Sequence, residues 1–158
     1  MSNRLTTLLV FLFCMAFAGC ASLKEKDTSV INLTYQQGKT SDDSWQDAEL
    51  KKEFERYWFS RFSGLWESTW LMEAPHFQEM TVEKKYEDFI KAHVGSRLLG
   101  IEIWNIEKET NNLTTIRCEI SYEKNGESKK YFNTDKWVKV SGKWYHLIQD
   151  RILFPSSM

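Results

Sequence analysis

The sequence predicts an α+β domain in which N-terminal helices pack on one face of a curved antiparallel sheet. Between residues 44 and 95 the apolar side chains recur every three or four positions, the period of an amphipathic helix. Beyond Arg97 the period falls to two, and Asn125-Gly126 and Ser141-Gly142 are typical hairpin turns. Helices and strands that are segregated along a chain favour helices on a single face of a sheet.

The first helix is expected to begin at Ser44. The sequence Ser44-Trp45-Gln46-Asp47 is a variant of the capping box, with Asp in the place of Glu or Gln. Apolar residues then follow at helical spacing, at Leu50, Phe54, Trp58, Phe62 and Leu65. We expect Gly64 to break or bend this helix.

Two further helices complete the helical half. A short one is expected to hold Trp66 and Trp70 and to end at Pro75, since proline interrupts helical hydrogen bonding. Thr81 can cap the next helix, which Gly95 closes. Apolar side chains form a stripe along this last helix, at Val82, Tyr86, Phe89 and Ile90.

Alternating residues then predict a meander of four strands. They are expected over residues 99–106, 116–122, 127–140 and 143–149, with a bend in the third near Thr134-Asp135. A turn at Asn111-Asn112 joins the first two strands, and Asn125-Gly126 joins the next pair, because both of its residues tolerate positive φ.

The closing hairpin assigns side chains to two faces. A two-residue loop at Ser141-Gly142 places Trp137 opposite His146 and Lys139 opposite Trp144. We expect Val138, Val140, Tyr145 and Leu147 to face the core. Trp137, Trp144 and His146 would then lie on the other face, as a pocket or a protein interface, or simply over neighbouring side chains of the outer sheet.

The N-terminus has the features of a secretory signal. Arg4 precedes an apolar run from Leu5 to Ala18, whose fourteen residues cover about 21 Å as a helix, less than the ~30 Å hydrocarbon core. The ending Phe17-Ala18-Gly19-Cys20 resembles the lipobox of bacterial lipoproteins, with Phe17 in place of the usual Leu. The resemblance implies that Cys20 receives acyl chains such as palmitate. The alternative is an ordinary signal peptide with an incidental cysteine.

The chain therefore divides into a signal peptide at 1–19, a lipidated Cys20 with a flexible tether at 20–43, and one folded domain at 44–158. The lipid would anchor a cell-envelope protein to a membrane. Ala21 follows the cysteine where Asp would be the usual retention signal, so the expected location is the periplasmic face of the outer membrane if the source is Gram-negative.

Composition excludes several classes of function. The chain has 21 basic and 22 acidic residues, a net charge of −1, which argues against a nucleic-acid partner. After processing, Cys118 is the only free thiol, so no intrachain disulfide forms and we expect this cysteine to be buried. Glu73 and His76 have a metal-like spacing, but Pro75 lies between them, and we expect neither a metal nor another cofactor.

The order of elements resembles the nuclear transport factor 2-like (NTF2-like) superfamily, an α+β cone of the cystatin-like type. The resemblance rests on Tyr57-Trp58 leading into Gly64-Leu65-Trp66, on Ala74-Pro75-His76-Phe77, and on the closing hairpin over 137–145. It covers residues 44–155. Such proteins include ketosteroid isomerases, dehydratases, epoxide hydrolases, transport adaptors and catalytically silent envelope proteins, so the resemblance leaves the activity open.

Two kinds of site follow. Aromatic residues can line the mouth of a cone that binds a small apolar ligand, among them Trp58, Trp66, Trp70, Tyr122 and Tyr131, although core packing is the commoner use of such residues. His146 and Asp135 are the nearest pair for acid/base work, as diagonal neighbours in the closing hairpin. No carboxylate is clearly forced inward in the strands.

The leading expectation is a tethered, non-enzymatic domain. It would bind a small apolar ligand inside the cone, or a protein partner or second copy of itself through the sheet face. The alternative is an isomerase or dehydratase with an acid/base pair inside the cone.

Overall fold

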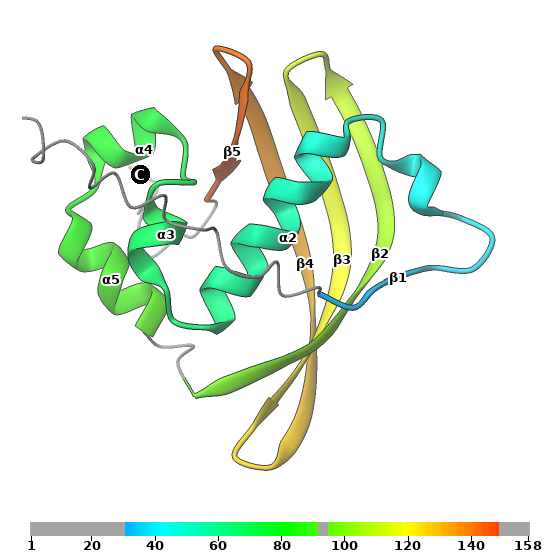
Figure 1. Ribbon diagram of the computed structural model, residues 1–158, viewed down its shortest axis with the longest axis horizontal. Coiled ribbons are helices and arrows are strands. Elements are labelled where there is room, and N and C mark those ends of the chain that lie inside the picture. Colours follow the sequence, from blue (N-terminus) through cyan, green and yellow to red (C-terminus); the bar gives the residue numbers. More distant parts are fainter. Residues whose placement is uncertain (1–30, 92–94, 149–158) are drawn as a thin grey trace, which may run out of the picture.

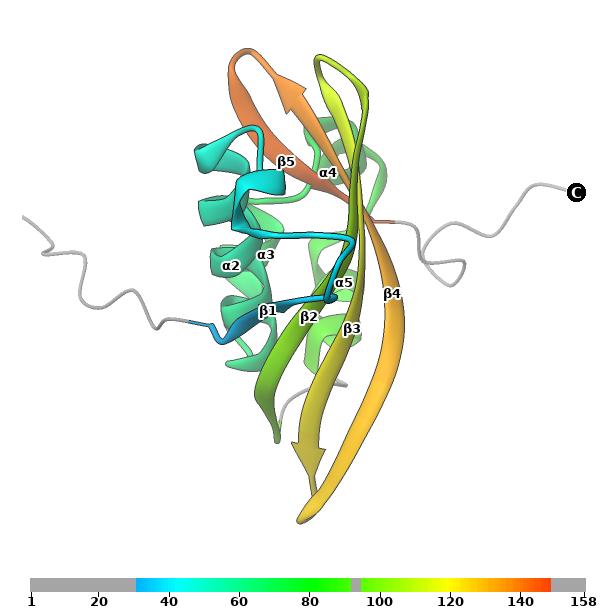
Figure 2. The same ribbon diagram turned by 90° about the vertical axis from the view of Figure 1, so that its right-hand side faces the viewer.

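The computed structural model describes residues 31–91 and 95–148 of the chain. The predicted signal peptide, Cys20 and the start of the predicted tether lie outside the described residues. The model confirms the α+β class: helices cover one face of a curved, five-stranded sheet, as the two views show (Figure 1, Figure 2).

The sheet has the strand order β1-β2-β3-β4-β5. Its strands are β1 (Leu33–Tyr35), β2 (Ser96–Thr110), β3 (Leu113–Lys124), β4 (Glu127–Val140) and β5 (Lys143–Leu147). The last four form the predicted antiparallel meander, whereas β1 pairs with β2 in parallel.

Both predicted hairpin turns are confirmed. Asn125 and Gly126 have φ of 55° and 77°, and Ser141 and Gly142 have φ of 51° and 84°. Two successive positive φ values define the type I′ turn, whose twist matches that of the flanking strands. The turn at Ser141-Gly142 produces the predicted register, with Trp137 opposite His146.

Part of the predicted tether belongs to the folded domain. Leu33 pairs with Ile101 of β2, and the side chain of Ile31 is buried. The Tyr35 hydroxyl hydrogen-bonds Asp42 and accepts a hydrogen bond of 3.1 Å from Trp45 Nε1. The domain therefore begins before the predicted boundary at Ser44.

The first long helix, α2 (Ala48–Phe62), begins later than predicted, because its N-cap is Asp47 and not Ser44. The Asp47 carboxylate accepts the backbone N–H groups of Glu49 and Leu50 at 2.9 and 3.3 Å, as an N-cap should. Ser44 instead ends a short 3-10 helix, η1 (Asp42–Ser44).

Three shorter helices follow, α3 (Trp66–Trp70), α4 (Pro75–Met80) and α5 (Glu83–Lys91). Helix α4 was not predicted: Pro75 starts a helix here, at the first position, where its missing N–H costs nothing. The segment between α3 and α4 pairs with β5, since Met72 O accepts the N–H of His146 at 2.8 Å.

The core lies between α2 and the concave face of the sheet. Its largest fully buried side chains in this layer are Phe54, Tyr57, Trp58 and Trp137. The prediction for the faces of the closing hairpin is wrong: Trp137 and Trp144 are 0% and 3% exposed and face the helices, whereas Val140 is exposed. A smaller cluster joins α4 and α5 to the end of the sheet, through Phe77, Tyr86, Ile90 and Ile148.

None of the helices described by the structure is both long and apolar enough to span a membrane.

Candidate functional site

A group of buried charged side chains lies where the helices meet β4 and β5. Glu73, Asp135 and His146 are 0%, 4% and 4% exposed. His146 Nδ1 lies 2.8 Å from Glu73 Oε2, and its Nε2 lies 3.4 Å from Asp135 Oδ1. An imidazole thus bridges two carboxylates in the interior.

The backbone explains how these three residues meet. His146 and Asp135 are diagonal neighbours, as the hairpin register predicted, but they lie on the concave face and not on the outer face that was expected. Glu73 is brought in by the segment before α4, where Ala74 N donates to His146 O at 2.9 Å. Gln78 fixes this segment, because its amide donates to the backbone oxygens of Trp70 and Glu73 at 2.9 and 2.8 Å.

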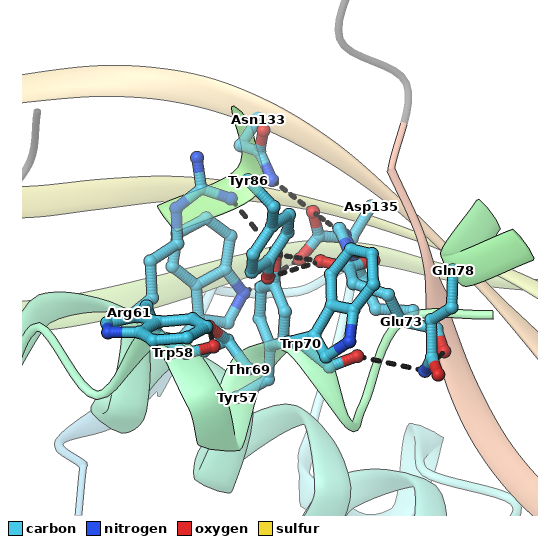
Figure 3. Close-up of polar contacts among 12 residues, drawn as sticks. Tyr57, Trp58, Arg61, Thr69, Trp70, Glu73, Gln78, Tyr86, Asn133 and Asp135 are labelled. Carbon is cyan, nitrogen blue, oxygen red and sulfur yellow. Dashed lines mark hydrogen bonds and ion pairs between the residues drawn. The ribbon is translucent and has the colours of Figure 1, made fainter. Parts of the chain in front are cut away.

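Neutral donors satisfy the remaining oxygens of the two carboxylates. The hydroxyls of Tyr57 and Tyr86 converge on Glu73 Oε1, at 2.9 and 2.8 Å (Figure 3). The Trp58 indole donates to Asp135 Oδ2 at 2.7 Å, and the Asn133 amide donates to Oδ1 of the same residue at 2.5 Å. Buried carboxylates need such donors, because desolvation without them is costly.

The two carboxylates keep His146 charged. Burial lowers the pKa of His146, but the charge of Glu73 and the hydrogen bonds to Asp135 and Glu73 more than offset it and raise that pKa to about 9. The imidazolium also lies against the Tyr57 ring, with the ring centroids 4.2 Å apart. Burial and the nearby Glu73 charge raise the pKa of Tyr57 and of Tyr86, so both hydroxyls remain donors.

Arg61, on the last turn of α2, completes the cluster. Its Nη1 donates to the Tyr57 hydroxyl at 3.1 Å, which links it through that hydroxyl to Glu73 (Figure 3). Its guanidinium carbon lies 5.2 Å from the ring centroid of Trp58 and 5.0 Å from that of Phe89. The cluster therefore holds two positive and two negative groups when His146 is protonated.

A cavity of about 290 Å³ opens beside these charges. Its polar wall includes Arg61, Asn133, Asp135 and His146, and its apolar wall includes Phe89, Leu147 and Ile148. A larger hollow of about 420 Å³ also lies by the C-terminal end of α2, near Phe62 and Leu98. The charged residue there, Arg97, is already paired with Glu123 at 2.8 Å, so we place the candidate site at the smaller cavity.

The structure brings three of the predicted aromatic and histidine residues to this site or next to it. Trp58 and His146 belong to the charged cluster, and the Trp137 ring contacts His146 with centroids 5.5 Å apart. Their burial makes Trp58 and Trp137 part of the core. The expectation that no carboxylate points inward from the strands is wrong, since Asp135 does.

The other predicted residues lie farther from the buried charges, although the Trp70 ring contacts that of Tyr86, with centroids 5.1 Å apart. Trp66 and Trp70 are half-buried beside α4 and α5. Tyr122 and Tyr131 pack against each other on the concave face, with centroids 5.8 Å apart. Trp144 is buried near the start of α2, where its indole donates to Asp47 at 2.8 Å.

The structure tests two further expectations, on Cys118 and on the pair Glu73 and His76. Cys118 is buried, as predicted, and burial raises the pKa of its thiol. Glu73 and His76 do not meet, because Glu73 is fully buried while His76 is exposed. Within the residues that the structure describes, no group of three or more His, Cys, Asp or Glu side chains is placed to hold a metal ion.

No protein-family model and no curated protein matches the chain. Solved structures do match the chain. A SEC-C motif protein from Psychrobacter arcticus is 13% identical, with a TM-score of 0.52 over 65% of this chain and 60% of its own length. A SEC-C motif protein from Rhodopseudomonas palustris is 13% identical, with a TM-score of 0.52 over 75% and 96% of the two chains.

A third structure, from Campylobacter jejuni, bears the name of an NTF2-like transpeptidase. It is 12% identical, with a TM-score of 0.50 over 65% of this chain and all of its own. The chain has an NTF2-like fold. At such identities the likeness concerns the fold alone. In this NTF2-like cone, the charged cluster lies on the concave surface, with the cavity beside it.

Sequence reasoning missed Arg61 as a member of the site and considered Glu73 only beside His76, as a metal pair that it rejected. A signal existed for Arg61, which follows Trp58 by three residues and Tyr57 by four and so interrupts the apolar stripe of the helix. No local signal marks Glu73, because its burial depends on the pairing of its segment with β5.

Proposed function

We propose that this chain is a lipid-anchored protein of the cell envelope whose NTF2-like domain binds a small ligand without catalysing a reaction. The observation that carries the proposal is the cavity of about 290 Å³ beside the charged cluster. Apolar Phe89, Leu147 and Ile148 line it together with polar Arg61 and Asn133, which favours a ligand with an apolar and a polar part over a purely apolar one.

The hydrogen-bond partners of His146, Glu73 and Asp135 support binding over catalysis. Both ring nitrogens of His146 face a carboxylate, and each oxygen of Glu73 and of Asp135 has a donor within the protein. A general base needs a free lone pair and a pKa near the working pH. An imidazolium with a pKa near 9 holds its proton at neutral pH.

A ligand screen tests the binding proposal. Full-length protein labelled with ¹⁵N is titrated with a library of small polar and apolar fragments, and amide shifts are mapped onto the chain. We expect saturable shifts confined to the ends of α2 and β5, around Arg61 and Leu147. Binding that maps only to the outer face of the sheet, or no binding at all, would contradict the proposal.

An acid/base enzyme is the second candidate. It is favoured by the long 3.4 Å contact between His146 and Asp135 and by the position of both at the cavity wall. Substrate-induced loosening of this contact would remove one of the two donors to Asp135 Oδ1, the other being the Asn133 amide. A proton-transfer assay on a β,γ-unsaturated ketone distinguishes the candidates: we expect the uncatalysed rate, and an acceleration that is lost in Asp135→Asn would favour the enzyme.

Binding of a protein partner or of a second copy through the sheet face is a further part of the proposal. The residues differ from those predicted, since Trp137 and Trp144 are buried. On the outer face, Phe132 is 66% exposed and contacts Trp104, with ring centroids 4.7 Å apart. Light scattering over a range of concentrations tests this part, with Phe132→Ser as the variant that should stay monomeric.

The anchor is proposed from the sequence alone. The run from Leu5 to Ala18 followed by Cys20 supports lipidation, and Ala21 supports the outer membrane in a Gram-negative source. Acyl chains contribute about 0.8 kcal/mol for each buried CH₂, so a multiply acylated protein stays attached.

A further inference from the structure

We infer that Arg61 is the anchor for the carboxylate of a small monocarboxylic acid bound in the cavity beside the charged cluster. This inference rests on the proposed ligand-binding function and names the chemical class of the ligand. It starts from the unused hydrogen-bonding capacity of one side chain.

Arg61 is the arginine without an ionic partner in the described part of the chain. The other three arginines there are paired: Arg56 with Glu53 at 2.8 Å, Arg97 with Glu123 at 2.8 Å and Arg117 with Glu107 at 3.6 Å. Among these same residues, Arg61 donates one hydrogen bond, to the neutral Tyr57 hydroxyl, and its Nε is buried without an acceptor.

An unpaired buried N–H group is expensive, typically by about 1–3 kcal/mol. The aromatic contacts of Arg61 do not remove this cost, because rings attract the cation without accepting a strong in-plane hydrogen bond. The guanidinium is also a wall of the cavity. An acceptor that enters the cavity would therefore satisfy the guanidinium, once a shift of the Arg61 side chain turns its enclosed Nε–H toward the cavity.

The surrounding charges select the acceptor. A guanidinium is planar and matches a carboxylate or a phosphate through two parallel hydrogen bonds. Asp135 and the protonated His146 also line the cavity, and their opposite charges offset each other, which leaves the single positive charge of Arg61. A singly charged carboxylate fits these conditions better than a phosphate dianion.

The size of the cavity and its apolar lining residues limit the rest of the ligand. A volume of about 290 Å³ lies just below the usual range of ligand pockets, about 300–1,000 Å³, so the ligand is small. Phe89, Leu147 and Ile148 offer apolar contact for a short hydrocarbon chain or ring. A short-chain or aromatic monocarboxylate meets both requirements.

The test compares hexanoate with hexanamide, which has the same length and no charge, and with inorganic phosphate. Each is titrated into the full-length protein, and binding is followed at the Arg61 Nε–H and Leu147 amide resonances. We expect hexanoate to bind at least tenfold more tightly than hexanamide, with no shift from phosphate. We expect Arg61→Met to weaken hexanoate binding tenfold or more at Leu147. Arg56→Met, a control on the solvent-facing side of the same helix, should leave it unchanged.

Equal affinity for hexanoate and hexanamide, or unchanged hexanoate binding in Arg61→Met, would overturn the inference and leave the proposed function standing. If no fragment binds at Leu147, the proposed function fails as well. If the thermal melt shows that Arg61→Met does not fold, Arg61→Lys replaces it in the test. Lysine keeps the positive charge but lacks the planar guanidinium. A tenfold loss of hexanoate affinity in Arg61→Lys supports the inference, and no loss overturns it.

Discussion

His146 gains its charge from the two carboxylates that it bridges, and four neutral donors hydrogen-bond to the oxygens of those carboxylates. The donors are the hydroxyls of Tyr57 and Tyr86, the Trp58 indole and the Asn133 amide. Burying ions is costly, and a network of this kind is stable only while every member has its partners. Removing one partner should therefore cost more than the loss of one hydrogen bond.

Glu73→Gln tests this dependence. The substitution keeps the size of the side chain but leaves His146 with a single carboxylate and gives the two tyrosine hydroxyls a weaker acceptor. We expect the free energy of unfolding to fall by about 3 kcal/mol in urea denaturation. Glu79→Gln, at an exposed position on α4, is the control and should change it by less than about 0.5 kcal/mol. Equal losses in the two variants would contradict the account.

The stability of the protein should also depend on pH through His146. The folded pKa, about 9, lies above the ordinary value of 6.5, so the contribution is complete below pH 6.5 and is lost as the pH rises through 9. We expect the free energy of unfolding to fall by about 3 kcal/mol between these pH values. The loss should shrink in Glu73→Gln. A flat profile in the wild type would show that His146 is not held as a cation.

At the scale of single elements, Asp47 connects helix α2 to the closing hairpin. Its carboxylate caps the helix and also accepts from Lys139 Nζ and Trp144 Nε1, both at 2.8 Å. Burial alone would raise the pKa of Asp47, but these hydrogen bonds lower it to about 2. One side chain thus sets both the start of α2 and its position on the sheet.

Two substitutions separate these roles. Asp47→Ala removes the cap and the ties to the hairpin, and we expect it to lower the free energy of unfolding by about 2 kcal/mol. Asp47→Asn keeps an N-cap acceptor but loses the ion pair with Lys139, and it should recover about half of that loss. Asp43→Ala, at a neighbouring exposed position, is the control. Thermal or urea unfolding measures all three, and equal losses for Ala and Asn would show that capping contributes nothing.

The turns and strand pairings were predicted from the sequence more accurately than the side of the sheet on which each side chain lies. The turns at Asn125-Gly126 and Ser141-Gly142 and the hairpin register follow from local chemistry and are confirmed. The two faces of the closing hairpin were assigned the wrong way round because Trp137, Lys139 and Trp144 share one face and mix polar with apolar side chains. Alternation alone therefore does not show which face packs against the helices. The decision depends on the packing of α2, which is a tertiary contact.

The candidate site was predictable only in part for the same reason. Its sheet members, Asp135 and His146, follow from the hairpin register. Glu73 reaches them through a bridge between its segment and β5, more than seventy residues away in the chain. Long-range pairing of that kind leaves no periodic trace in the sequence around Glu73.

At the scale of the whole molecule, the proposed anchor decides where the domain works. We expect Cys20→Ser to block lipidation, so that the protein appears in the soluble fraction or keeps its unprocessed mass. Membrane fractionation with intact-mass spectrometry measures both properties, and Cys118→Ser, at a buried thiol, is the control that should stay attached. A Cys20→Ser protein with unchanged mass and membrane attachment would contradict the lipoprotein proposal.

The binding proposal as a whole depends on a charged, fully partnered imidazolium at the cavity wall, in place of a base with a free nitrogen. The most direct measurement is the ¹⁵N chemical shift of both His146 ring nitrogens, followed by NMR from pH 5 to pH 10. The account predicts that both nitrogens carry protons at pH 7.5 and that the pKa lies near 9. A neutral ring at pH 7.5, with one nitrogen unprotonated, would contradict it.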